Sequence, residues 1–302
     1  MPSLAATIVT FNPDIQTLVR LVEILINRAE KVILVDNGSA QETLQELSRF
    51  SDNPRVKLLL IGANLGVSAA HNLALNWAVS EGYTHAAMFD QDSLPDESML
   101  DELMRVEGDL RAAGKHVAAI GPQYFDPRHL APAPFIRLEG GLIRKICCSR
   151  ESEIVPVDYL ITSGTLIRLD VLKEVGMLDE SLFIDYIDIE WCLRAKAKGF
   201  QSYGVCSAKM HHSLGDEVVS WRNGKRLISV RTPLRNYYLF RNAVLLYKRS
   251  YIPWVWIFND AYRLLLKLGF FTLITPPRLV NLKMMTLGLL HGMMGRSGPY
   301  PR

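Results

Sequence analysis

The feature that most constrains the fold is a regular alternation of two hydrophobic patterns along the N-terminal part of the chain. Short apolar runs, typical of buried strands, cover residues 4–10, 31–35, 56–61, 86–89 and 117–120. Between them, apolar residues recur at the spacing of amphipathic helices. Strands that alternate with helices form right-handed βαβ crossovers. We therefore expect an α/β fold with a mainly parallel central sheet and helices on both faces.

Local signals indicate where these helices begin and which side they bury. Asp14 is a candidate N-cap for the first helix, and Ser39 with Glu42 has the spacing of a capping box for the second. The third is expected after Gly66. Apolar spacing predicts that the first helix buries Leu18, Leu21, Val22 and Leu25. In residues 121–157, which are proline-rich, we expect an antiparallel extension of the sheet.

Polar clusters follow four of the predicted strands, at the edge where parallel sheets bind their ligands. The clusters are Thr10-Phe11-Asn12, Asp36-Asn37, Asn64-Leu65-Gly66 and Asp90-Gln91-Asp92. Asp90 and Asp92 project to the same side of an extended chain, and paired carboxylates suit a divalent cation that shares its ligands with a diphosphate. Taken alone, this pair also fits a solvated turn. Four clusters at one edge favour a mononucleotide diphosphate.

Two familiar nucleotide-binding signatures are absent from the sequence. The glycines of residues 62–66 lack the G-x-G-x-x-G spacing of dinucleotide-binding proteins, and no Gly-Lys-Ser/Thr follows them. This argues against a dehydrogenase and against a P-loop NTPase.

Two later stretches add candidate site residues. Ser163-Gly164 interrupts a predicted strand, which indicates either close approach of a ligand or a plain bulge. A helix is expected to start near Asp188 and to end at Gly199, so Asp188 is either an N-cap or a functional carboxylate near a helix N-terminus. Asp185 and Glu190 lie close to it in sequence. Three carboxylates in six residues repel one another unless cations or substrate hydroxyls are near.

A pair of histidines, His211 and His212, stands at the end of another predicted strand. A histidine in this position is either structural or a metal ligand. Its occurrence in a chain that already offers paired aspartates keeps the metal interpretation open.

These motifs, in this order, resemble the family-two glycosyltransferases with the GT-A fold, and are similar to their rhamnosyltransferase branch. The motifs are TFNP, VDNGS, NLG, DQD, SGT, FIDYIDIEWCLR and HHSLG, within residues 4–250. The resemblance implies an inverting, metal-dependent transfer of L-rhamnose from dTDP-L-rhamnose to a hydroxyl of a cell-surface polysaccharide, lipopolysaccharide or glycolipid. The alternatives are another nucleotide sugar, or a sugar nucleotidyltransferase, although that class normally has an early glycine-rich basic loop that residues 10–16 lack.

The resemblance also implies roles for individual residues. Asp188 would be the catalytic base, and Asp92 and His212 would bind Mg²⁺ or Mn²⁺ together with Asp90. Asp36 would accept the imide proton of the base. The other donor-binding residues would be Thr10, Phe11, Asn12, Asn64, Gly66, Asn72, Gln91 and Arg241, the last offsetting diphosphate charge. Ser163, Gly164 and Asp185 would lie on the acceptor side.

One departure from the family pattern concerns the base. Many relatives have Glu immediately before the catalytic Asp, whereas this chain has Ile187. The local field at Asp188 therefore differs, and Asp185 becomes a rival for the same role.

Composition predicts the compartment and a division of the chain. The four cysteines, Cys147, Cys148, Cys192 and Cys206, lack CxxC spacing, and we expect reduced thiols in a cytoplasmic protein. The N-terminus lacks the pattern of a secretory signal. We expect a GT-A catalytic domain in residues 1–220 and a basic helical region in residues 221–302.

The basic region predicts an anionic partner. From Arg222 onward there are 14 Lys and Arg and one acid, Asp260, against 20 basic and 30 acidic residues before it. This asymmetry, with the aliphatic and aromatic character of the region, favours an anionic membrane surface over nucleic acid, for which no module is present. We expect interfacial helices at the inner face of the plasma membrane; helices packed on the catalytic domain are the alternative.

Overall fold

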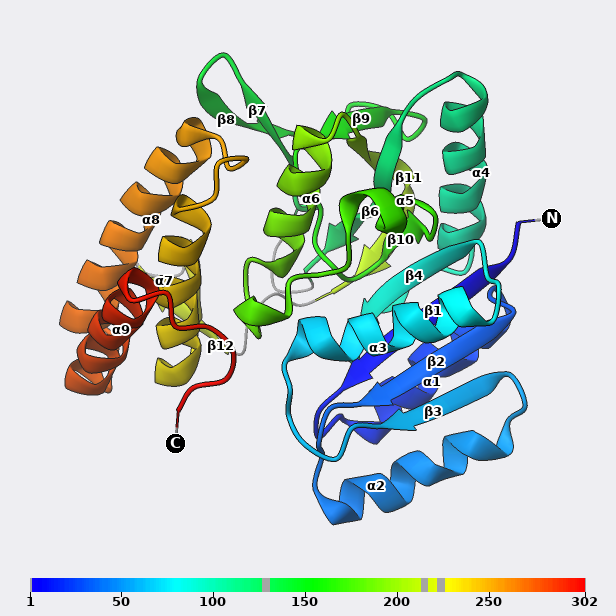
Figure 1. Cartoon of the computed structure of the whole chain (residues 1–302), viewed down its shortest axis with the longest axis horizontal. Coiled ribbons are helices and arrows are strands. Elements are labelled where there is room, and N and C mark those ends of the chain that lie inside the picture. The colour runs from blue at the N-terminus through cyan, green and yellow to red at the C-terminus, as the bar shows by residue number, and fades with distance from the viewer. Residues whose placement is uncertain (1, 127–130, 213–216, 222–225, 302) are drawn as a thin grey trace.

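The structure is a computed structural model and describes residues 2–126, 131–212, 217–221 and 226–301. A central sheet carries helices on both faces, and a group of C-terminal helices lies at one end of the molecule (Figure 1). The predicted α/β architecture is therefore confirmed.

The N-terminal half of the sheet is parallel, in the order β3-β2-β1-β4. Its strands are β1 (Leu4–Thr10), β2 (Lys31–Asp36), β3 (Val56–Leu60) and β4 (His85–Asp90). The helical connections are α1 (Ile15–Ile26), α2 (Gln41–Ser48), the short η1 (Arg49–Asp52) and α3 (Val67–Ser80). Because these crossovers return each strand in the same direction, the carboxyl ends of all four strands share one edge.

Most of the local predictions for this half are confirmed. Asp14 caps α1 by accepting a hydrogen bond from the Thr17 backbone N–H at 2.8 Å, and the four predicted apolar positions of α1 are buried. The predicted capping box of α2 is wrong. Ala40 is the N-cap of α2, because the hydroxyl of Ser39 is directed to Asp36 instead.

The rest of the sheet is mixed and continues in the order β4-β10-β6-β11-β5. Its strands are β5 (Leu94–Pro95), β6 (Val117–Phe125), β10 (Thr165–Arg168) and β11 (Gln201–His211), with β9 (Ile154–Val157) antiparallel to β11. The hairpin of β7 (Phe135–Glu139) and β8 (Leu142–Ile146) stands apart from the main sheet. The expected antiparallel extension is thus confirmed for β9 only.

Two apolar layers cover the faces of the sheet. One face packs against α1 and α4 (Met99–Ala112), the other mainly against α3 and α6 (Ile187–Ala197). Alternate residues of β1 enter opposite layers, as Val9 and Ile8 illustrate, because successive side chains of a strand point to opposite faces. Between β10 and α6 lie α5 (Val171–Val175) and η2 (Glu180–Leu182).

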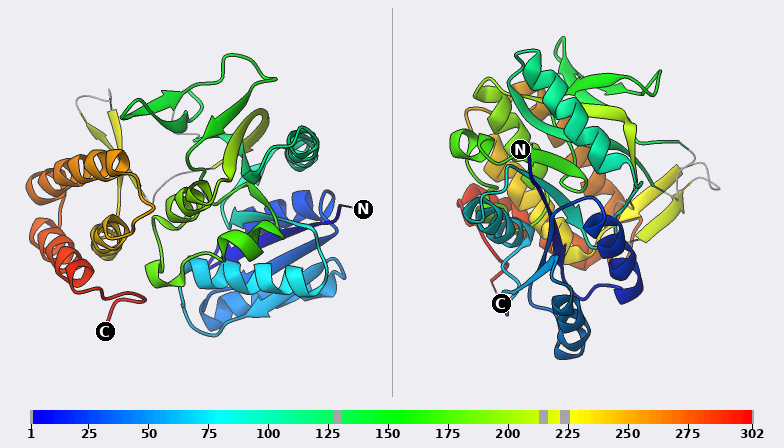
Figure 2. Two further views of the ribbon diagram at one scale, coloured as in Figure 1. Left: turned by 45° about the horizontal axis from the view of Figure 1, so that its top comes forward. Right: turned by 90° about the vertical axis from the view of Figure 1, so that its right-hand side faces the viewer.

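The C-terminal region begins with a hairpin and continues with three helices. These elements are β12 (Glu217–Trp221), β13 (Arg226–Val230), α7 (Pro233–Tyr247), α8 (Trp254–Leu273) and α9 (Arg278–Met293). In Figure 1 and in the left view of Figure 2 the three helices lie together beside the sheet and its covering helices. The division between residues 220 and 221 stays a prediction, and it falls inside β12.

The cysteines do not all remain thiols, so that prediction is wrong. Cys148 and Cys206 form a disulfide with Cα atoms 5.9 Å apart, whereas Cys147 and Cys192 are free. The two partners are 58 residues apart in the chain. The fold brings the β8–β9 connection into contact with β11. The spacing of the cysteines along the sequence does not predict this contact, because it depends on the tertiary structure.

Candidate active site

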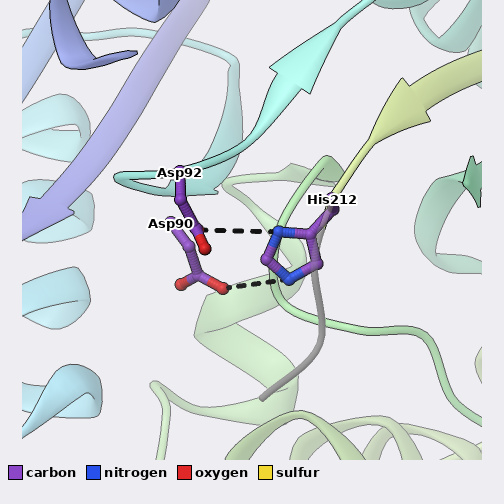
Figure 3. A group of neighbouring side chains, drawn as sticks. All are labelled: Asp90, Asp92 and His212. Carbon is purple, nitrogen blue, oxygen red and sulfur yellow. Dashed lines mark ion pairs between the residues drawn. The ribbon is translucent and has the colours of Figure 1, made fainter. Parts of the chain in front are cut away.

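Strand pairing brings the predicted metal ligands together. Asp90 ends β4, and Asp92 lies in the turn to β5, which pairs with the end of β11 just before His212. One carboxylate or imidazole atom from each of these three residues lies within 4.8 Å of the others. The imidazole Nε2 of His212 is 3.7 Å from Asp90 Oδ2, and its Nδ1 is 3.7 Å from Asp92 Oδ1 (Figure 3). Two carboxylates and an imidazole fit Mn²⁺ or Mg²⁺.

Two buried serine hydroxyls, those of Ser93 and Ser163, form hydrogen bonds that orient this cluster. The Ser93 hydroxyl lies 2.9 Å from Nδ1 of His212 and 2.5 Å from the Ser163 hydroxyl. Ser163 in turn accepts a hydrogen bond from the backbone N–H of Asp90 at 3.2 Å. Ser93 was missed by sequence reasoning, although its place directly after Asp92 is the signal that would have found it.

The structure places Ser163 and Gly164 behind this cluster, and their contact with the acceptor stays a prediction. Ser163 is fully buried. Gly164 has a left-handed φ of 77°, and a Cβ there would lie 2.7 Å from Pro122 and 2.9 Å from the sulfur of Met210. The close approach at this glycine is therefore to the protein core.

The loops after β1 and β2 are held together at the donor edge. The buried carboxylate of Asp36 accepts hydrogen bonds from the backbone N–H groups of Gly38 and Ser39, both at 3.0 Å. Asn12 donates its backbone N–H to the Ser39 hydroxyl at 2.8 Å, and its side chain accepts from the Ala40 N–H. Asp36 and Asn12 thus stabilise the same loop at the carboxyl end of the strands.

The other predicted donor residues of the N-terminal half meet at this edge. Phe11 is 46% exposed, and its backbone N–H donates to the Gln91 side chain at 2.7 Å. The amide oxygen of Asn64 accepts from the Gly66 N–H at 3.1 Å. Thr10 is buried, and its hydroxyl donates to the carbonyl of Val35.

Gly66 also fixes the segment that leads to α6. Its φ is 96°, and a Cβ there would lie 2.6 Å from the Phe183 carbonyl oxygen. The next residue, Val67, donates its N–H to the same oxygen at 2.8 Å. The strict need for glycine at this position therefore comes from a backbone contact within the protein.

Two predicted donor residues lie elsewhere. The buried side chain of Asn72 exchanges hydrogen bonds with the backbone of Leu178 at 2.9 and 3.0 Å. Arg241, also fully buried, donates to the carbonyls of Leu182 and Ser181 at 2.9 and 3.3 Å. These side chains hydrogen-bond within the protein and support the segment before α6, and their contact with the donor stays a prediction.

Two other arginines pair with Asp185. Nη1 of Arg231 lies 2.7 Å from one oxygen of Asp185, and Nε of Arg235 lies 3.4 Å from the other. Burial raises the pKa of Asp90, the charge of Asp92 adds to this rise, and His212 and Arg235 oppose it. Arg235 is therefore within electrostatic reach of Asp90. The sequence predicted this cationic role for Arg241.

Asp188 stands in the first turn of α6, with a partly buried carboxyl group. Its Oδ1 accepts from the Ile189 N–H at 2.9 Å. Burial raises the pKa of Asp188 to about 6, and the charges of Asp185 and Asp90 contribute. Glu190, which the sequence offered as a second cause, is instead paired with Arg194 at 2.8 Å.

A hydrogen bond from the C-terminal region stabilises the segment before Asp188. Tyr186, the residue before α6, has a left-handed φ of 65°, and its hydroxyl donates to Asp260 of α8 at 2.9 Å. The remainder of the HHSLG motif, Ser213 to Gly215, lies outside the described residues.

Solved structures define the class of the fold. GalNAc-T7 in complex with UDP, GalNAc and Mn²⁺ matches with a TM-score of 0.59 at 14% identity, over 87% of this chain and 54% of that one, so the chain spans about half its length. The mannosyltransferase PcManGT from Pyrobaculum calidifontis, in complex with GDP-Man and Mn²⁺, matches with a TM-score of 0.56 at 12% identity, over 97% and 75%. The fold is the GT-A fold of nucleotide-sugar transferases.

Sequence comparison gives the family. Residues 6–146 match Glycosyl transferase family 2. Over 295 residues the chain is 29% identical to the dTDP-rhamnosyl transferase RfbF of Shigella flexneri, covering 97% of this chain and 96% of the relative. The protein is a glycosyltransferase with a family 2 domain, as the sequence motifs predicted.

Proposed function

We propose that the protein is an inverting, metal-dependent rhamnosyltransferase that uses dTDP-L-rhamnose. The observation that carries this proposal is the convergence of Asp90, Asp92 and His212 next to a carboxyl group of raised pKa, Asp188. The choice of donor is supported by the similarity to the dTDP-rhamnosyl transferase of Shigella flexneri, which extends over nearly the whole length of that protein.

In the proposed reaction, Asp188 takes the proton of an acceptor hydroxyl. The hydroxyl oxygen then forms a bond to the anomeric carbon while the bond from that carbon to the diphosphate breaks, and dTDP departs with the electron pair. Attack from the face opposite the leaving group inverts the anomeric centre. A general base of this kind acts best when its pKa is near the working pH, which the burial of Asp188 favours.

Asp90, Asp92 and His212 would hold Mg²⁺ or Mn²⁺, which when bound supplies positive charge to the departing diphosphate. Arg235, whose charge acts on Asp90, would add a cation beside the diphosphate, and Arg engages phosphate oxygens through its planar fork. Ser93 orients the imidazole of His212.

The metal proposal is tested by Mn²⁺ binding to the full chain, followed by the paramagnetic resonance of the free ion. Asp92→Asn is expected to weaken Mn²⁺ binding by about 10-fold or more, since a ligand carboxylate is lost. Asp96→Asn, four residues along the same connection, serves as the control. Equal binding by wild type and Asp92→Asn would contradict the assignment of these ligands.

The donor proposal is tested by calorimetry with a panel of nucleotide sugars. We expect dTDP-L-rhamnose to bind more tightly than UDP-GlcNAc or GDP-mannose, and to be consumed when a saccharide acceptor is added. Tighter binding of a UDP- or GDP-sugar would assign another donor and leave the glycosyltransferase class intact.

The proposed acceptor is a hydroxyl of a cell-surface polysaccharide, lipopolysaccharide or glycolipid. The proposed location is cytoplasmic, with peripheral association at the inner face of the plasma membrane. The basic C-terminal region supports an anionic membrane surface as the partner, and no nucleic-acid partner is proposed.

A further inference from the structure

Helix α8 packs on the protein through a side that carries Asp260 among apolar residues. Its buried residues, Trp256, Asp260, Leu264 and Phe271, recur at helical spacing on one side, and Asp260 accepts hydrogen bonds from Tyr186 and Tyr247. Burial lowers the pKa of Lys267, on the same side, to about 8, and Arg231 and Arg263 contribute. The inner side of α8 therefore faces the charged surroundings of the proposed active site.

The opposite side of α8 is apolar and exposed. Trp254, Phe258, Leu265 and Leu273 are 66%, 68%, 64% and 71% exposed and recur at helical spacing. A helix packed on a globular protein normally buries its apolar side and exposes its charged side. Helix α8 already buries Trp256, Leu264 and Phe271 and still exposes this second apolar side, so the hydrophobic effect favours a further partner for its outer side.

Helix α9 continues the same surface. It packs on α7 through Asn281, Met285 and Gly288, whereas Leu279 and Met293 on its other side are 81% and 59% exposed. Helices α8 and α9 lie side by side at the outer margin of the molecule (Figures 1 and 2). We call this surface the outer apolar face, defined by Trp254, Phe258, Leu265, Leu273, Leu279 and Met293.

The charges of α8, α9 and the chain after them have one sign. Residues 254–298 contain five basic side chains, Arg263, Lys267, Arg278, Lys283 and Arg296, and a single acid, Asp260. Asp260 is buried and points inward. A second copy of the chain would bring like charges together at this face, whereas anionic headgroups complement them.

We propose that the outer apolar face docks on a bilayer surface that contains anionic lipid, with α8 and α9 lying in the interface. Among the helices that the structure describes, none is long and apolar enough to cross a membrane. Aromatic and aliphatic side chains flanked by Lys and Arg are typical of helices that lie at this boundary.

Docking in this orientation has a consequence for the acceptor. The hydrogen bond from Tyr186 to Asp260 places the start of α6 on the protein side of α8, roughly one helix diameter, about 10 Å, from the docked surface. This deepens the proposed function, because it points to acceptors carried at the membrane surface. The docking itself requires no transfer reaction.

The test is flotation of the full chain with vesicles of phosphatidylcholine alone or mixed with phosphatidylglycerol, without nucleotide or acceptor. We expect binding to the mixed vesicles that weakens in high salt. The variant Trp254→Ser/Phe258→Ser/Leu265→Ser should bind at least about 10-fold more weakly, since three exposed apolar groups are lost. Leu73→Ser/Val79→Ser on α3, also at exposed apolar positions, is the matched control and should bind like wild type.

A charge variant separates the electrostatic contribution. Arg278→Gln/Lys283→Gln should lose affinity for mixed vesicles by about fivefold per charge and lose part of the salt dependence. The proposal is overturned if wild type does not float, or if the triple variant floats equally well. If the wild type formed a concentration-dependent dimer without vesicles and the triple variant did not, the outer apolar face would be assigned to contact with a second copy of the chain. Absence of rhamnosyl transfer would leave these results unchanged, so the two failures are distinguishable.

Discussion

At the scale of single residues, Asp185 and Asp188 lie three positions apart in contrasting surroundings. Asp185 is paired with both Arg231 and Arg235, so its charge is already balanced within the protein. Asp188 has no ion pair among the described residues, and burial raises its pKa to about 6. This contrast favours Asp188 as the proposed base and Asp185 as the residue that positions the two arginines.

We expect Asp188→Asn to lower kcat by about 100-fold or more, the usual effect of losing a positioned base. The affinity for dTDP-L-rhamnose should stay close to that of wild type, because the substitution keeps the shape of the side chain. Asp185→Asn should reduce kcat less and chiefly weaken substrate binding, as it releases Arg231 and Arg235. An active Asp188→Asn together with an inactive Asp185→Asn would reverse the two roles.

The raised pKa of Asp188 predicts a pH dependence. A base must be deprotonated to act, so kcat/KM should fall about tenfold per pH unit below a midpoint near 6 and level off above it. Asp185→Asn should move this midpoint to lower pH, since it removes a negative charge that raises the pKa of Asp188. A midpoint near the ordinary aspartate value of about 4 in the wild type would contradict the assignment.

At the scale of elements, α8 is part of the proposed active site. Asp260 accepts from Tyr186 at 2.9 Å and from Tyr247 at 2.8 Å, and burial raises the pKa of Asp260. Tyr186 immediately precedes α6, so this contact fixes the left-handed turn that presents Asp188. We therefore regard Asp260 as a positioning residue for the base.

The positioning role is tested with Asp260→Asn, Tyr186→Phe and the double variant. Each single substitution should lower kcat by about 10-fold, the order expected for a hydrogen bond to a charged group, with little change in donor affinity. If Asp260 acts through Tyr186, the double variant should be no worse than either single one. Losses that multiply in the double variant would show that the two residues act independently.

The packing of α9 on α7 gives a stability prediction. A Cβ at Gly288 would lie 2.5 Å from the carbonyl oxygen of Tyr237, whereas Gly269 in α8 has no neighbour within 4 Å of that position. Gly288→Ala should destabilise the protein in urea unfolding by about 2 kcal/mol through overpacking. Gly269→Ala, the control, should stabilise it by about 0.5–1 kcal/mol through helix propensity. Equal effects would exclude close packing at Gly288.

At the scale of the whole molecule, the C-terminal region and the GT-A fold depend on each other. Arg241 of α7 donates a hydrogen bond to the carbonyl of Leu182. The Arg249 guanidinium pairs with Glu190 at 3.0 Å. Asp260 accepts a hydrogen bond from the Tyr186 hydroxyl. The C-terminal helices therefore complete the segment that carries the base.

We expect truncation after Arg249 to remove most transferase activity even with a water-soluble acceptor, because Asp260 and the α9 support of α7 are lost. Activity would be measured by release of dTDP, with circular dichroism as the control for folding. A folded truncated chain with full activity would show that α8 and α9 act only in membrane docking.

The sequence by itself determined the α/β class, the parallel half of the sheet and the edge that carries the site. These follow from periodicities within short windows and from the rule that ligands gather at the carboxyl ends of strands. The convergence of Asp90, Asp92 and His212 was predictable for the same reason, because each of them stands at or just beyond the end of a strand.

Only the tertiary structure decided the hydrogen-bond partners of Arg241 and Asn72, the Cys148–Cys206 disulfide and the orientation of α8. The helical pattern of α8 contains both a charged stripe and an apolar stripe, and the pattern is the same whichever stripe faces the protein. The partners of Asp260 lie 74 and 13 residues away, immediately before α6 and on α7. Their hydroxyls turn the side of α8 that carries Asp260 inward, because a buried carboxylate requires hydrogen-bond donors and the fold supplies them there.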